Sequence, residues 1–132
     1  MTNYLMFPII GFIIFYVLYS KGVILANFDF ITPKEAMSII QNEENNMTIL
    51  DVRTKDEYKM GYIKNSKLIP LQELSQRLNE LQKFKNKKIL VYCASGSRSV
   101  AASRILEKNG FTPYNINGGI SNWSNSGYKI TK

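Results

Sequence analysis

The sequence contains no histidine, and only one of its 132 residues is a cysteine. Without an imidazole base, the chain cannot use the Ser-His or Cys-His pairs that activate the nucleophile of many hydrolases. A zinc site is not expected either, because zinc in proteins is held mainly by cysteine and histidine. A single cysteine also excludes a disulfide within the sequence, so the hydrophobic core has to stabilise the fold.

The composition is that of one compact domain with a short additional segment. A chain of this length has room for a domain of about a hundred residues, and 45% of the residues are hydrophobic, as in ordinary globular proteins. The net charge is +7, and lysines gather between residues 83 and 88, which is typical of a solvated surface. No base-reading motif or aromatic stacking platform accompanies them, so nucleic-acid binding is not expected.

Residues 4–19 contain no charged or strongly polar side chain. A helix over this range would span only about 24 Å, short of the roughly 30 Å hydrocarbon core of a bilayer. Beyond Lys21 the apolar run resumes, and a helix continued to Ala26 would reach about 34 Å, with Lys21 extending its amine toward the headgroups. We therefore expect a transmembrane anchor over residues 1–27, followed by a domain over residues 28–132.

A cleaved signal peptide and a buried helix of the domain are the two alternative interpretations of this segment, and the second is disfavoured because the remaining chain can fold without it. Signal peptides begin with a positively charged stretch, but no Lys or Arg precedes the apolar run. A retained anchor is therefore favoured, which would make the protein a single-pass membrane protein. Because Lys21 and Lys34 follow the span, the positive-inside rule favours a cytoplasmic domain, with a periplasmic or exported domain as the alternative.

Short apolar runs alternate with helical patterns over the rest of the chain. The expected strands cover residues 28–31, 47–52, 67–71, 89–92 and 114–116. The expected helices begin after the N-caps Thr32 and Thr54, cover residues 72–81 and 99–109, and follow Gly119. Strands that alternate with helices pair in parallel through right-handed crossovers, so we expect an α/β fold with a parallel sheet.

One loop combines the features of a catalytic site. It leaves the end of the buried strand, runs directly into the next helix, and consists of Cys93, Ala94, Ser95, Gly96, Ser97, Arg98 and Ser99. In open α/β sheets, ligands bind in the crevice at the carboxyl ends of the strands. The small side chains let several backbone N–H groups turn inward, and such a nest at a helix N-terminus binds an anion.

The anion that this nest would hold is the sulfur of Cys93. A helix N-terminus and a nearby arginine both favour a thiolate, so the nucleophile would need no general base. Arg98 offers a planar pair of donors for an oxyanion such as thiosulfate. The alternative is that Cys93 is only a small buried apolar side chain. The small-residue loop followed by Arg98 favours the nucleophile.

Together with six other motifs, the loop resembles the single-domain rhodanese family. These motifs are Asp51-Val52-Arg53, Glu57-Tyr58, Gly61-Tyr62-Ile63, Ile69-Pro70-Leu71, Gly118-Gly119 and Trp123. They occur in the family's order and at its spacings over residues 28–132. The resemblance implies a five-stranded parallel sheet flanked by helices, and a sulfurtransferase that uses no cofactor and no metal.

In the family that the sequence resembles, sulfane sulfur moves by a ping-pong reaction. The resemblance implies that Cys93 takes sulfur from thiosulfate, a polysulfide or a protein persulfide, and passes it to cyanide or a thiol. It also implies that residues 94–99 bind the substrate. Asp51 and Arg53 would form a structural pair that supports the active loop.

Two features distinguish this chain from related patterns. Tyr62 stands where the family often has histidine, a change that affects packing more than mechanism. Arg98 lies five positions after Cys93, whereas related phosphatases and arsenate reductases place the arginine at the sixth position. The shorter loop is too small for a phosphoryl group but adequate for one sulfur atom.

The alternative to a sulfurtransferase is a non-catalytic module that docks or regulates a membrane partner. The intact cysteine and loop favour the enzyme.

Overall fold

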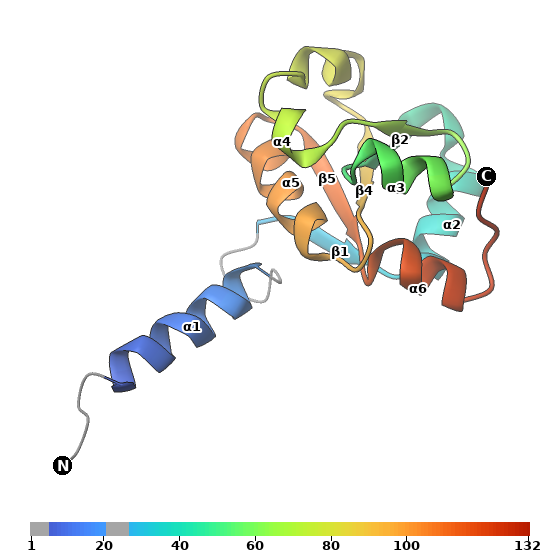
Figure 1. Cartoon of the computed structure of the whole chain (residues 1–132). Coiled ribbons are helices and arrows are strands. Elements are labelled where there is room, and N and C mark those ends of the chain that lie inside the picture. Colours follow the sequence, from blue (N-terminus) through green and yellow to red (C-terminus); the bar gives the residue numbers. More distant parts are fainter. Residues whose placement is uncertain (1–5, 21–26) are drawn as a thin grey trace.

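Within residues 6–20 and 27–132, which the computed structural model describes, five parallel strands form a central sheet (Figure 1). The strands lie in the order β1-β5-β4-β2-β3, and the pairing between each neighbouring pair is parallel. The predicted α/β fold with a five-stranded parallel sheet is therefore confirmed. The bounds of the strands are Asp29–Ile31 (β1), Met47–Asp51 (β2), Ser66–Leu68 (β3), Lys88–Tyr92 (β4) and Thr112–Ile116 (β5).

Helices pack against both faces of the sheet. Neighbouring residues of β4 point to opposite faces, so Ile89 and Val91 belong to one buried cluster while Leu90 and Tyr92 belong to the other. Because both faces are covered, the strand reads as an unbroken apolar run. The first cluster packs against α4 (Leu71–Leu74), the 3-10 helix η2 (Leu78–Phe84) and α5 (Ser97–Lys108). The second packs against α2 (Pro33–Asn42) and α6 (Gly119–Asn125).

Two threonines begin helices as the sequence predicts. Thr32 Oγ1 accepts a hydrogen bond from the Glu35 N–H at 3.1 Å at the start of α2. At the start of α3 (Lys55–Met60), Thr54 Oγ1 accepts one from the Glu57 N–H at 3.2 Å. The carboxylate of each glutamate accepts the N–H of its threonine in return, which completes a capping box.

The predicted helix over residues 72–81 is wrong, because two shorter segments, α4 and η2, take its place. Between them the Arg77 N–H bonds to the carbonyl of Leu74, three residues back, at 3.0 Å. Side chains three apart lie on one face of a 3-10 helix as well as of an α-helix, so the leucine spacing cannot distinguish the two. Leu74 and Leu81 both reach the core. A further 3-10 helix, η1 (Glu44–Asn46), connects α2 to β2.

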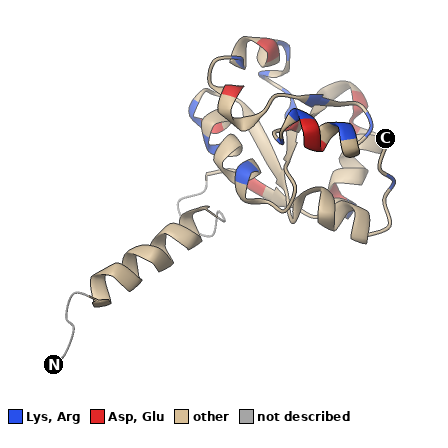
Figure 2. Cartoon of the chain, in the orientation of Figure 1, with Lys and Arg blue, Asp and Glu red and all other residues tan. Residues whose placement is uncertain are grey.

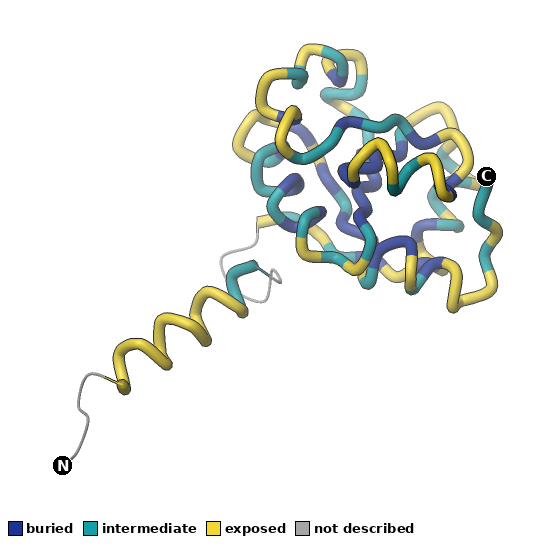
Figure 3. The backbone as a smooth tube through the Cα atoms, in the orientation of Figure 1, coloured by how far each residue is buried: buried dark blue, intermediate teal, exposed yellow. Residues whose placement is uncertain are grey.

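The N-terminal helix α1 (Met6–Ser20) carries no charged residue (Figure 2), and most of its length is exposed (Figure 3). Its 15 residues rise about 22 Å. Among the described residues, no helix is both long and apolar enough to cross a membrane. The transmembrane helix expected over residues 1–27 is therefore not confirmed, and its continuation through residues 21–26 lies outside the described part of the chain. The last turn of α1 contacts α5, where the guanidinium carbon of Arg104 lies 3.6 Å from the centroid of the Tyr19 ring.

Candidate active site

Cys93 follows β4 directly, at the carboxyl edge of the sheet and between the ends of β2 and β5. Only 1% of the residue is exposed. A short bend then leads into α5, so the predicted loop connects the middle strand of the sheet to the helix that covers it. Of the other predicted loop residues, Ser99 is buried, Ala94, Gly96 and Arg98 are half-buried, and Ser95 and Ser97 are exposed.

The sulfur of Cys93 faces the first turn of α5. The backbone N–H of Gly96 donates a hydrogen bond to Sγ at 3.0 Å, and the thiol lies 3.5 Å from Ser99 Oγ. Ser99 Oγ donates in turn to the Gly96 carbonyl at 3.1 Å. Gly96 has a φ of 118°, in the left-handed region that glycine adopts readily. A backbone donor and the positive end of a 12-residue helix thus lie next to the sulfur, and both favour negative charge there.

The N-terminus of α6 holds the other side of the loop. The N–H groups of Ile120 and Ser121 donate to the carbonyls of Cys93 and Ala94 at 2.9 and 3.2 Å. These bonds are possible because Gly119 lies against the loop backbone. A Cβ at this position would stand 2.3 Å from the carbonyl oxygen of Cys93. The sequence assigns the glycine pair at the start of α6 to a tight turn and a close backbone approach, and the structure shows both.

Arg98 is paired with Glu57, a residue that sequence analysis does not assign to the site. Nη1 and Nη2 of Arg98 donate to Oε1 and Oε2 of Glu57 at 2.6 and 2.8 Å. The pair joins the first turn of α5 to α3 across 41 positions of sequence, and no local pattern could have indicated it. The role of Arg98 as a ligand for a substrate oxyanion stays a prediction, since its guanidinium is hydrogen-bonded to the Glu57 carboxylate in this structure.

The Arg98 guanidinium lowers the pKa of Glu57 to about 2 by hydrogen bonding to its carboxylate. Burial opposes this shift, and the hydrogen bonds from Thr54 in the capping box add to it. The pKa of Arg98 is raised, chiefly by its hydrogen bonds to Glu57. Both groups are therefore charged near neutral pH, where an ion pair joins α3 and α5.

Replacing Glu57 with glutamine should lower the free energy of unfolding near neutral pH but not in strong acid. The pKa of Glu57 falls from 4.5 to about 2 in the fold, so the charged pair contributes fully above about pH 4.5 and loses its effect as the pH falls toward 2. The side chains of Arg98 and Glu57 are 34% and 32% exposed. Solvent screening therefore limits the contribution of their ion pair to the free energy of unfolding to about 1 kcal/mol. Denaturant titrations of both proteins between about pH 7 and pH 3 measure the difference.

Glu35→Gln is the matched control for this substitution. Glu35 occupies the same capping-box position in α2 and forms no ion pair with a described residue. Glutamine can also complete a capping box, so both substitutions keep the cap. The control should therefore show no loss that depends on pH. A loss in Glu57→Gln that persists unchanged in acid would contradict an ion-pair origin.

Asp51 and Arg53 form a buried ion pair beneath the loop. Asp51 ends β2 and is fully buried, and Arg53 is 5% exposed. Arg53 Nη2 donates to Asp51 Oδ2 at 2.7 Å and to the Gly61 carbonyl at 2.6 Å, while its backbone N–H donates to Oδ1 at 2.8 Å. The Arg53 guanidinium carbon also lies 5.6 Å from the ring centroid of Tyr92, the residue before Cys93. This arrangement is consistent with the structural role that the resemblance implies.

Tyr92 connects the ion pair to the segment after α3. Its hydroxyl accepts a hydrogen bond from the Ile63 N–H at 3.1 Å and lies 3.1 Å from Ser66 Oγ. Burial raises the pKa of Tyr92, and the charge of Asp51 raises it further. The phenol therefore stays protonated and anchors the end of β4 to the segment after α3.

Among the described residues, no group of three or more acidic or cysteine side chains could hold a metal ion.

Comparisons with known proteins agree with this geometry. Residues 32–126 match the family model described as the rhodanese-like domain. The chain is 30% identical over 113 residues to the uncharacterized protein YqhL of Bacillus subtilis, across 81% of this chain and 88% of YqhL. The putative sulfur carrier protein YrkF of the same organism is 36% identical over 91 residues, across 68% of this chain and 48% of YrkF, so the chain spans about half of that relative. A solved rhodanese-like domain protein from Staphylococcus aureus is 36% identical with a TM-score of 0.68, covering 80% of this chain and 100% of that one.

Proposed function

Because the chain belongs to the family of rhodanese-like domains, we propose that it is a sulfurtransferase that carries sulfane sulfur on Cys93. The donor would be thiosulfate, a polysulfide or a protein persulfide, and the acceptor would be cyanide or a thiol. The observation that carries this proposal is the hydrogen bond from the Gly96 N–H to Cys93 Sγ at 3.0 Å, at the N-terminus of α5. This contact favours a nucleophilic thiolate in a chain that has no histidine to deprotonate it.

In the first half of the reaction, the Cys93 thiolate attacks the outer sulfur of thiosulfate. A new S–S bond forms, the S–S bond of thiosulfate breaks, and its electron pair leaves with sulfite. Cys93 is left as a persulfide whose terminal sulfur carries the negative charge. The backbone donor and the helix N-terminus beside Cys93 would stabilise this charge. Arg98 would bind the sulfonate oxygens if it exchanged one of its two contacts with Glu57.

In the second half, the acceptor attacks the terminal sulfur of the persulfide. With cyanide, a carbon–sulfur bond forms, the S–S bond breaks, and the electron pair returns to Cys93 as a thiolate. Thiocyanate leaves, and the protein is ready for another cycle without any net oxidation or reduction. The name of YrkF, a putative sulfur carrier protein, supports a role of this chain in carrying sulfur.

Thiosulfate treatment of the full chain should add the mass of one sulfur atom, and cyanide should remove it. The same treatment of Cys93→Ser should add nothing, because a hydroxyl neither ionises at neutral pH nor forms a persulfide. Intact-mass spectrometry measures both results. Phosphatase activity without any persulfide would contradict the proposal and assign the loop to phosphoryl chemistry instead.

We also propose that α1 attaches the chain to a membrane, with the domain on the cytoplasmic side. The observation in support is a row of exposed apolar side chains without any charge along the helix, among them Phe7 at 72% and Phe12 at 70% exposed. Burying such a surface in acyl chains is favourable by about 25 cal/mol per Å². Flotation with phospholipid vesicles tests the attachment, and a reporter fused to the carboxyl terminus tests the side.

A further inference from the structure

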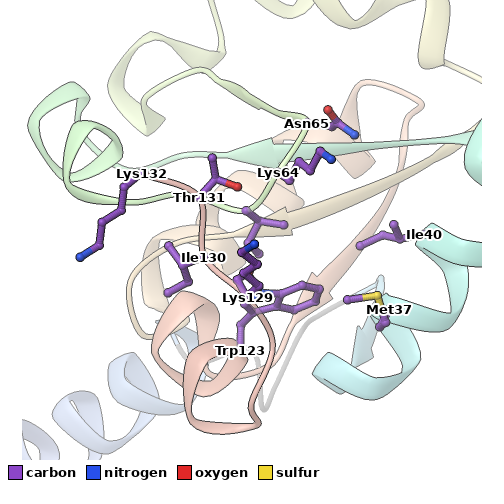
Figure 4. A pocket seen from close by; sticks show the side chains of 10 residues that line it. Met37, Ile40, Lys64, Asn65, Trp123, Lys129, Ile130, Thr131 and Lys132 are labelled. Carbon is purple, nitrogen blue, oxygen red and sulfur yellow. The ribbon is translucent and has the colours of Figure 1, made fainter.

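A second feature of the molecule has the form of a binding site, a groove of about 580 Å³ between α2, the segment after α3 and the last four residues. This volume is within the usual range for ligand pockets. Figure 4 shows the side chains that line it. Trp123 lies at its centre, with Met37 and Ile40 of α2 on one side and Ile130 on the other. The floor of the groove is therefore apolar, and one aromatic ring dominates it.

The rim of this groove is basic. Lys64, Lys129 and Lys132 line it, all three are exposed, and none forms an ion pair with a described residue. No acidic side chain belongs to the lining. We refer to this site as the lysine-rimmed groove. Its charge and its apolar floor together are complementary to a ligand that carries negative charge beside an apolar group.

The lysine-rimmed groove adjoins a second groove whose walls include residues bonded to the active-site loop. Ile130 and Lys132 also line a neighbouring groove of about 620 Å³, whose other walls include Glu57 and Ile120. Glu57 pairs with Arg98 of the loop, and the N–H of Ile120 donates to the carbonyl of Cys93. A ligand lying in the lysine-rimmed groove would therefore extend along the same surface toward the loop that carries the sulfur.

We propose that the lysine-rimmed groove docks the protein that accepts sulfur from Cys93, through a segment with acidic residues next to a large apolar side chain. The apolar side chain would enter the groove over Trp123, and the acidic residues would pair with the lysines. Three lysines spread around the rim match several carboxylates, which a peptide segment supplies and a fatty acid does not. The groove also extends beyond the needs of cyanide or thiosulfate. This inference rests on the proposed sulfurtransferase function.

The test compares sulfur transfer to two synthetic peptides that differ in charge. One is acetyl-Cys-Gly-Glu-Leu-Phe-Glu-Asp-amide, and in the other lysines replace the three acids. The full chain, kept in solution with a neutral detergent and loaded with thiosulfate, should transfer sulfur to the acidic peptide about tenfold faster, as expected for several charge pairs acting together. The double variant Lys64→Glu with Lys129→Glu should abolish this preference. Circular dichroism confirms that the variant is folded.

Lys83→Glu with Lys87→Glu is the matched control, because it changes the net charge equally at lysines of the 83–88 cluster, which do not line the groove. It should keep the preference for the acidic peptide. If wild type transfers equally fast to both peptides, or if the control loses the preference as fully as the groove variant, the docking proposal is overturned.

Binding can be measured apart from chemistry, which separates this inference from the proposed function. Trp123 is the only tryptophan of the chain and is 2% exposed. In full-length Cys93→Ser, the acidic peptide should change the emission of Trp123, and the basic peptide should not. Such binding together with no persulfide in wild type would overturn only the sulfurtransferase. A persulfide with no emission change, or displacement of the peptide by dodecanoate at equal concentration, would overturn only the docking site.

Discussion

Asp51→Asn is expected to destabilise the fold by about 3 kcal/mol, because it leaves the Arg53 guanidinium buried without its counter-charge. Asp51 is fully buried, and Arg53 beside it is 5% exposed, so water cannot replace the lost charge. The amide would keep one acceptor for the backbone N–H of Arg53, which now donates to Oδ1 at 2.8 Å. Urea or guanidinium titration of the variant and the wild type measures the loss.

Two controls separate the buried charge from other effects of this substitution. Glu73→Gln breaks an exposed pair with Arg77 and should cost less than about 1 kcal/mol. Replacing both partners, as Asp51→Leu with Arg53→Met, should cost less than Asp51→Asn, since no unpaired charge remains buried. If the double replacement were the more damaging of the two, the pair would be stabilising through the hydrogen bond from Arg53 to the Gly61 carbonyl rather than through compensation of charge.

Gly119→Ala is expected to lower sulfur transfer from thiosulfate to cyanide about a hundredfold, because the loop must move to make room for a methyl group. The added Cβ would stand 2.3 Å from the carbonyl oxygen of Cys93 and 2.7 Å from that of Ala94. Both are backbone atoms, so no side chain can rotate away. Displacing them breaks the hydrogen bonds from Ile120 and Ser121 to these two carbonyls. Steady-state kinetics, with kcat/KM for thiosulfate as the measure, test this result.

Gly127→Ala is the matched control for this effect. Gly127 also has a positive φ, +89° against +60° at Gly119, but a Cβ there meets no atom within 4 Å. Both variants therefore carry a backbone strain of about 1–2 kcal/mol, and only Gly119→Ala adds the collision with the loop. The kcat/KM of the control for thiosulfate should stay within about threefold of the wild-type value. Equal losses in the two variants would mean that strain, and not the position of the loop, limits the reaction.

Most of the sheet could be predicted from local patterns. The mainly apolar runs at residues 47–52 and 89–92 are found as β2 and β4, because strands covered on both faces carry apolar side chains on both. The capping threonines were also identifiable, since a cap depends on residues within one turn. The helix over residues 72–81 was not, because its leucine spacing fits two kinds of helix.

The candidate site could be predicted in part. Cys93 and its loop are contiguous in the sequence, and the small residues between a buried strand and a helix indicate a nest without any knowledge of the fold. The partner of Arg98 could not be predicted, because Glu57 lies 41 positions away and its capping-box context is the same as that of Glu35. The catalytic and substrate-binding roles of the loop residues stay predictions that the proposed experiments test.

The sequence by itself determined that this protein has one thiol, no imidazole, an alternation of strands and helices, and a small-residue loop at the end of a buried strand. Only the tertiary structure decided that Glu57 pairs with Arg98, that the N-terminus of α6 donates hydrogen bonds to the loop, and that Lys64, Lys129 and Lys132 line one groove with Trp123. The reason is the range of the interactions. Propensity, capping and periodicity act between residues a few positions apart, whereas these contacts exist only once the sheet and its helices have packed.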